Sequence, residues 1–222
     1  MQELRVKLQA SPLLARALPF VVFLVLTSAQ GWFGEAGRYW IYAGKTLVGA
    51  WLVWLVRPYV AELKWTVSWE AIVAGVAVFA LWVGLEPYYP KLGTPGKPWN
   101  PHLAFGTGSA LAWFFVVVRI VGSSVVVPPI EEVFYRSFIY RYLVRQEFMT
   151  VPLGAFSWMP FLVTSAVFGL AHFEWVPGIL CGMIYQGLVC GKKRLGDAMT
   201  AHAITNLLLG LWVAGRGAWQ FW

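Results

Sequence analysis

Long apolar stretches separated by short polar breaks run along most of the chain. Four of them approach the roughly 20 residues that a helix needs to cross about 30 Å of hydrocarbon. These four lie near residues 12–29, 41–60, 67–85 and 103–127. Four others are shorter or more polar, as expected for helices buried among the rest, and lie near residues 130–147, 156–173, 176–190 and 197–213. The pattern predicts an all-α fold, a polytopic integral membrane helical bundle of about eight transmembrane helices.

One linker differs from the short breaks. Residues 86–102 contain Pro87, Pro90, Pro95, Pro98 and Pro101. Proline has no backbone N–H and breaks helix interiors, so we expect an extended loop at the membrane surface. The linker divides front hydrophobic helices within residues 1–102 from a motif-bearing core at residues 103–222. We treat residues 1–222 as a single membrane domain, because both halves must share one helical bundle.

The composition excludes two classes of protein. Hydrophobic residues make up 59% of the chain and charged residues 12%, about half the charged fraction of soluble domains. High hydrophobicity also excludes intrinsic disorder. The formal charge is +7, but basic residues beside apolar spans are what bilayer topology and anionic headgroups favour. The sequence therefore predicts a lipid bilayer as a partner and no nucleic acid.

A first polar motif interrupts the apolar back half. Glu131, Glu132 and Arg136 lie within six residues, and each charge at mid-bilayer costs at least about 2.5 to 3.5 kcal/mol. Pro128 and Pro129 are expected to end the preceding helix and to place the glutamates in the first turn of a new one, where the helix dipole favours carboxylates. Glu132 and Arg136 are one turn apart and can pair, which leaves Glu131 free. A simpler interpretation is that both glutamates cap a helix at the interface.

Two further motifs carry histidines. Phe168 and His172 lie at the end of one stretch, and His202 and Asn206 lie one turn apart in the last stretch, with Asp197 as its expected N-cap. Taken alone, His172 can be an interfacial residue and the second pair an interhelical hydrogen bond. Their coincidence with the glutamates favours a functional site.

Together these residues suit hydrolysis. A carboxylate such as Glu131 can take a proton from water, His172 can share that water, and His202 with Asn206 can donate hydrogen bonds to a developing oxyanion. One geometric condition must be met. Strict alternation of helix directions starts the His202 helix on the opposite side from Glu131 and His172, so tilted helices or a re-entrant segment must close the gap.

The three motifs resemble a known family. Glu131-Glu132-xxx-Arg136, Phe168-xxx-His172 and His202-xxx-Asn206, in this order, are similar to the motifs of the CAAX protease and bacteriocin-processing family, which includes the CAAX prenyl endopeptidases. The resemblance covers roughly residues 127–210.

The resemblance implies a glutamate-dependent intramembrane endopeptidase acting on a membrane-associated protein or peptide. It assigns water activation to Glu131 and His172, an oxyanion hole to His202 and Asn206, and supporting roles to the other motif residues, which are Glu132, Arg136 and Phe168. The short chain is similar to a bacterial subgroup that accompanies exosortase sorting systems. This subgroup implies the bacterial inner (cytoplasmic) membrane.

The sequence leaves alternatives for the cofactor, zinc or none, and for the function, an enzyme or a noncatalytic protein. Relatives are also described as metalloproteases, and Glu131, His172 and His202 are the candidate zinc ligands. We favour a metal-free site, because no HExxH-type pair preorganises two ligands on one helix. The alternative function is a noncatalytic membrane protein of the same fold in protein sorting or bacteriocin immunity. A transporter ranks third, since no repeated halves are apparent.

Overall fold

The computed structural model describes residues 1–92 and 97–222, and every regular element within these ranges is helical. The all-α expectation is confirmed. The α-helices are α1 (Gln2–Ala10), α2 (Pro12–Ser28), α3 (Gly34–Val56), α4 (Trp69–Leu85), α5 (Pro101–Phe105), α6 (Ala110–Val121), α7 (Val127–Glu132), α8 (Tyr140–Val144), α9 (Trp158–Leu170), α10 (Trp175–Lys192) and α11 (Gly196–Arg216). Short 3₁₀ turns lie at Ala29–Gly31, Arg57–Tyr59, Glu86–Tyr88, Phe148–Thr150 and Trp219–Phe221.

Helices α6, α7 and α8 form one continuous helix, Ala110–Val144. Two π-helical turns, Gly122–Val126 and Val133–Ile139, join its three parts. The expectation that Pro128 and Pro129 separate two helices is therefore wrong. The Val127 N–H bonds the Gly122 carbonyl five residues back, and this widened turn gives room to the proline rings that follow. Consequently both glutamates lie within a long helix, and the argument from a helix N-terminus does not apply to them.

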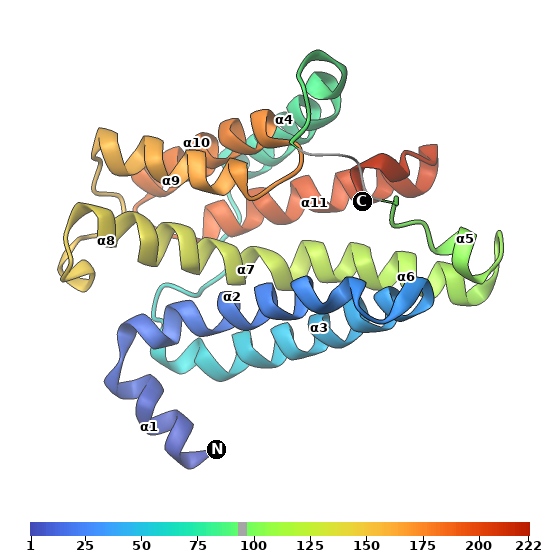
Figure 1. Cartoon of the computed structure of the whole chain (residues 1–222). Coiled ribbons are helices and arrows are strands. Elements are labelled where there is room, and N and C mark those ends of the chain that lie inside the picture. The colour runs from blue at the N-terminus through green and yellow to red at the C-terminus, as the bar shows by residue number, and fades with distance from the viewer. Residues whose placement is uncertain (93–96) are drawn as a thin grey trace.

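This long helix runs through the middle of the molecule (Figure 1). The pair α2 and α3 packs on one side of it, and α4, α9, α10 and α11 lie on the other. Helix α11 contacts both α7 and the π-helical turn that precedes it. The first and third motifs are thereby brought against each other.

Small residues allow the helices of the second side to approach closely. A Cβ on Gly178 would lie 2.9 Å from the Gly169 Cα, and one on Gly182 would lie 2.8 Å from the Ser165 Cα, so α9 and α10 meet backbone to backbone. A Cβ on Gly75 of α4 would lie 2.7 Å from the Ala201 carbonyl oxygen of α11. Such contacts are typical of helices packed in membranes.

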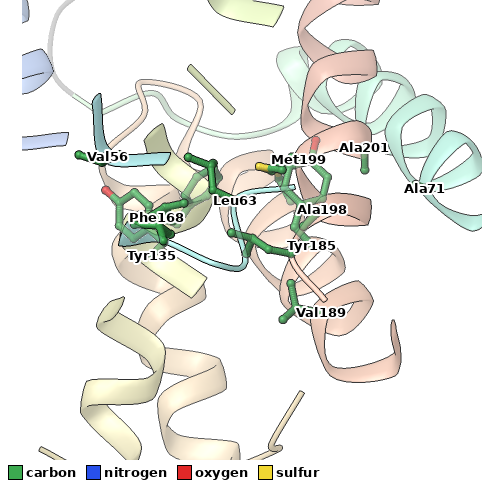
Figure 2. Close-up of a cluster of buried hydrophobic side chains, with 14 of the residues drawn as sticks. Val56, Leu63, Ala71, Tyr135, Phe168, Tyr185, Val189, Ala198, Met199 and Ala201 are labelled. Carbon is green, nitrogen blue, oxygen red and sulfur yellow. The ribbon is translucent and has the colours of Figure 1, made fainter. Parts of the chain in front are cut away.

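The main core cluster includes one motif residue. Figure 2 shows Phe168 beside Tyr135, with Tyr185, Met199 and other buried side chains in the same cluster. The Phe168 ring is 1% exposed and meets the Tyr135 ring edge-on at 5.2 Å. Phe168 therefore joins the second motif to the core.

Four helical stretches of the described residues are long and apolar enough to cross a membrane: Pro12–Gly31, Trp69–Tyr88, Ala110–Val144 and Gly196–Arg216. Large apolar side chains such as Trp54 and Trp69 face outward, as lipid contact requires. The count of eight spans stays a prediction. Of the proline-rich linker, residues 93–96 lie outside the described residues. The rest has no regular secondary structure apart from the 3₁₀ turn Glu86–Tyr88 and the start of α5 at Pro101, and it bends at Tyr89 and Leu92.

Candidate active site

A cavity of about 240 Å³ lies where α7, α11 and the turn between α9 and α10 meet. Four residues singled out from the sequence line it together: Glu131, His172, His202 and Asn206. Phe168 lines it as well, and its ring centroid lies 4.8 Å from that of His172 and 6.1 Å from that of His202. The three motifs therefore meet at one cavity.

The two adjacent glutamates have different surroundings. The Glu131 side chain borders the cavity and is 17% exposed, whereas Glu132 is completely buried. Glu132 Oε2 lies 3.2 Å from Arg136 Nε, so the pairing expected from their spacing is present. The Arg136 guanidinium also lies 4.2 Å from the centroid of the Phe168 ring, a cation–π contact. Glu131 is left to face the cavity.

His202 stands between the two carboxylates. Its Nδ1 lies 2.9 Å from Glu132 Oε1, and its Nε2 lies 4.0 Å from Glu131 Oε2. If Glu132 is ionised beside Arg136, it can only accept, so Nδ1 carries a hydrogen and donates it. Nε2 then points to Glu131 and the cavity, and it donates a hydrogen bond only when the ring is doubly protonated.

Asn206 is oriented by the Ser123 carbonyl, which has no helical N–H partner because of a proline. Its Nδ2 donates to the Ser123 carbonyl oxygen at 2.8 Å. In the π-helical turn the Ser123 carbonyl would pair with the residue five positions on, which is Pro128 and has no N–H. One Nδ2 hydrogen is used in this way, and the other remains for a ligand in the cavity.

His172 lies in the turn after α9 and bends back toward that helix. Its Nδ1 lies 2.7 Å from the Phe168 carbonyl oxygen, which can only accept, so Nδ1 carries the hydrogen. A neutral His172 therefore presents a bare Nε2. Trp82 of α4 fixes the other side of the ring with an edge contact at 5.5 Å.

Strict alternation of helix directions predicted a gap between His202 and the pair Glu131 and His172. The structure does not show this gap. It rested on Glu131 beginning a helix, whereas Glu131 lies inside the continuous Ala110–Val144 helix, at the level where α11 crosses it. A second expectation needs correction. Asp197 is not the N-cap of α11, because Leu195 holds that position. Asp197 instead accepts hydrogen bonds from Thr66 and Ser68 and ties the loop before α4 to α11.

Within residues 1–92 and 97–222, no three His, Cys, Asp or Glu side chains gather closely enough to hold a metal. The Nδ1 atoms of His172 and His202 are engaged by Phe168 and Glu132, which leaves each Nε2 unengaged. Only the two Nε2 atoms and Glu131 remain as donors.

Residues 112–208 match the family model described as Type II CAAX prenyl endopeptidase Rce1-like. This segment is similar to the Rce1-like family. All seven motif residues named from the sequence lie inside the Rce1-like segment. The match and the apolar helices together indicate an integral membrane protein of the CAAX protease kind. No curated protein and no solved structure matches the chain.

The Rce1-like segment contributes further cavity residues that the motif analysis missed. Tyr185 of α10 is completely buried, donates to Thr205 Oγ1 at 2.7 Å and packs on the His202 ring at 5.4 Å. Arg119 of α6 lines the same cavity, and its position as a charge within an apolar span could have revealed it.

Glu174, which directly precedes α10, also lines the cavity. Its side chain is buried, with 8% of the residue exposed. Burial raises the pKa of Glu174 above its ordinary value, and Glu86 adds to the effect. Glu174 also borders the neighbouring hollow formed by the linker and the Trp219–Phe221 turn, so it stands where the two spaces meet.

Proposed function

We propose that this protein is an intramembrane endopeptidase that hydrolyses a peptide bond of a membrane-associated protein or peptide without a metal ion. The proposal rests above all on one observation, the meeting of Glu131, His172, His202 and Asn206 at a single cavity. Placement in a bacterial inner membrane is part of the proposal.

In the proposed reaction, a water molecule lies between Glu131 and the bare Nε2 of His172. Glu131 takes a proton from this water, and the hydroxide attacks the carbonyl carbon of the peptide bond. The carbonyl oxygen becomes an oxyanion, which receives hydrogen bonds from the second Nδ2 hydrogen of Asn206 and from Nε2 of a protonated His202. The proton then passes to the departing nitrogen, the C–N bond breaks, and a carboxylate and an amine leave.

The experiment is a peptide cleavage assay with the full chain in lipid nanodiscs. A library of internally quenched apolar peptides serves as substrate, with and without a chelator. Glu131→Gln should lower kcat at least about 10²-fold, because it removes the base. Asn206→Ala should lower kcat by about 10² to 10³, as loss of an oxyanion donor does elsewhere. Glu147→Gln, on an exposed loop residue, is the matched control and should leave the rate unchanged.

Two results would contradict the proposal. Equal cleavage by the wild type and by Glu131→Gln would remove the glutamate from the mechanism. Loss of wild-type activity with the chelator, restored by zinc, would replace the metal-free site by a zinc site.

A further inference from the structure

A hollow of about 610 Å³ lies at the end of the bundle where α8 and α10 finish and α11 begins. It is separate from the active-site cavity, because no residue lines both. The side chains of Lys64, Arg141, Lys193 and Arg194 line it, and the one acidic side chain among its lining residues is Glu62. The hollow therefore carries a net positive charge, which favours an anionic ligand.

The four cations differ in how they are engaged. Arg141 donates to a backbone carbonyl at 2.8 Å, and Arg194 pairs with a carboxylate of α11. Among the described residues, the ammonium groups of Lys64 and Lys193 have no hydrogen bond and no carboxylate within salt-bridge distance, and both residues are exposed. Glu62 does not offset them, because an arginine of α2 holds its carboxylate with hydrogen bonds of 2.8 and 2.9 Å. An anion in the hollow would give both lysines a counter-charge.

The backbone at Lys193 is unusual for a lysine. Lys193 is the C-cap of α10 in the left-handed conformation, with φ of 56°, and no other described residue apart from glycines has a positive φ. Glycine is the usual residue there, because a Cβ is unfavourable in this conformation. The stem of the lysine is also closely packed, since a Cβ on Gly154 would lie 2.9 Å from Lys193 Cγ. A residue kept at an unfavourable backbone position points to a function for its side chain.

The location of the hollow indicates where an anion would come from. Basic residues gather at this end of the bundle, on the left of Figure 1, in α1, after α3, at the end of α8 and in the run 192–194. The opposite end holds Arg38, Lys91, Lys97 and Arg216. An excess of Lys and Arg is typical of the cytoplasmic end of a membrane protein, and the cytoplasmic leaflet carries anionic phospholipids. Exposed Met149 and Pro152 also line the hollow and suit contact with a lipid.

We propose that this hollow binds the phosphate group of an anionic phospholipid, with Lys64 and Lys193 as its two cationic contacts. Lysine binds phosphate as a point charge. In phosphatidylglycerol the phosphate gives the headgroup a net negative charge, whereas in phosphatidylcholine the positive choline cancels it. The bound lipid would join the loop before α4 to the turn between α10 and α11. This site goes beyond the proposed function and does not require hydrolysis.

Native mass spectrometry of the full chain in detergent micelles tests the site. Phosphatidylglycerol and phosphatidylcholine with identical acyl chains are titrated separately, and the dissociation constants of the first bound lipid are compared. Phosphatidylglycerol should bind about tenfold to thirtyfold more tightly, since each basic residue near an anionic headgroup contributes about a factor of five. The double variant Lys64→Gln/Lys193→Gln should reduce this preference to about twofold or less. Lys7→Gln/Arg145→Gln removes two exposed cations of the same end outside the hollow and is the matched control, with the preference retained.

A second variant separates lipid binding from folding. Lys193→Gly introduces the residue that the left-handed conformation favours, so the melting temperature should stay equal or rise. The preference for phosphatidylglycerol should nevertheless fall by about fivefold. A lower melting temperature with an unchanged preference would show that Lys193 serves the fold and would overturn the proposal.

Three further results would overturn it. They are equal affinity for the two lipids, a preference that survives Lys64→Gln/Lys193→Gln, and an equal loss of preference in the control variant. Inorganic phosphate is added as a competitor in a separate titration, and we expect it to leave phosphatidylglycerol bound when the two are equimolar. Displacement at equimolar phosphate would mean that the hollow takes a free phosphate and not a lipid. None of these measurements involves peptide cleavage, so failure of the lipid site leaves the proposed function standing, and failure of the protease leaves the lipid site standing.

Discussion

Glu131 and Glu132 are neighbours in the sequence, yet their side chains have different surroundings and different roles. The Glu131 carboxylate has no hydrogen-bond partner for Oε2 within the described residues and faces the cavity. Glu132 is enclosed between Arg136 and His202. A buried ion pair that loses one member leaves the other charge uncompensated, at a cost of about 3 to 5 kcal/mol. Thermal stability should therefore distinguish Glu131→Gln from Glu132→Gln, although we expect both substitutions to remove activity.

We expect Glu131→Gln to leave the melting temperature of the protein nearly unchanged and Glu132→Gln to lower it clearly. The double variant Glu132→Gln/Arg136→Gln should recover part of the loss, because both charges are then removed. Thermal unfolding in detergent, followed by intrinsic fluorescence, measures all three. A larger loss for Glu131→Gln than for Glu132→Gln would reverse the assignment of the two side chains.

At the scale of elements, the widened turn before α7 connects the prolines to the site. Pro128 lacks the N–H that would bond the Ser123 carbonyl, and that carbonyl instead fixes Asn206. Pro128→Ala restores an N–H and allows the helix to regularise. We expect equal or greater thermal stability and a fall in kcat/KM of about tenfold to a hundredfold, since small displacements of positioned groups cost rates of this order. Pro87→Ala, in the linker, is the control, and an equal effect of both variants would show that Asn206 does not depend on the turn.

The hydrophobic pattern of the sequence predicted where the helices of this bundle lie. It did not predict how they join. Each of the eight apolar stretches contains a helix, because segment length and hydrophobicity are local properties. The fusion of two of them across Pro128 and Pro129 depends on a π-helical turn whose stability comes from packing against α3 and α11, which is not a local property. The same holds for the site: spacing paired Glu132 with Arg136, while the cavity contacts of Arg119, Glu174 and Tyr185 arise only in the folded chain.

At the scale of the whole molecule, one buried network joins the front half to the back half. Glu62, in the loop before α4, accepts hydrogen bonds from Arg16 of α2 at 2.8 and 2.9 Å. It also accepts one from Ser137 in the second π-helical turn, and Arg141 of α8 lies 3.7 Å away. Burial by itself would raise the pKa of Glu62, but Arg16 and Ser137 outweigh burial and hold this pKa below its ordinary value of about 4.5.

This network should make stability depend on pH in a predictable direction. A carboxylate whose pKa is lowered by folding stabilises the folded state above its unfolded pKa, and that contribution is lost as the pH falls through the folded value. At pH 7, Glu62→Gln should therefore unfold at a clearly lower temperature than the wild type, because Arg16 and Arg141 lose their counter-charge, at a cost of about 3 to 5 kcal/mol. The difference should shrink as the pH falls below about 4.5, when the wild-type carboxylate also becomes protonated. Glu3→Gln, in an exposed pair with Lys7, should show no difference at any pH. If the difference in unfolding temperature between Glu62→Gln and the wild type stays constant from neutral to acidic pH, the charge of Glu62 does not stabilise the contact between the halves. Its packing would then account for the whole effect.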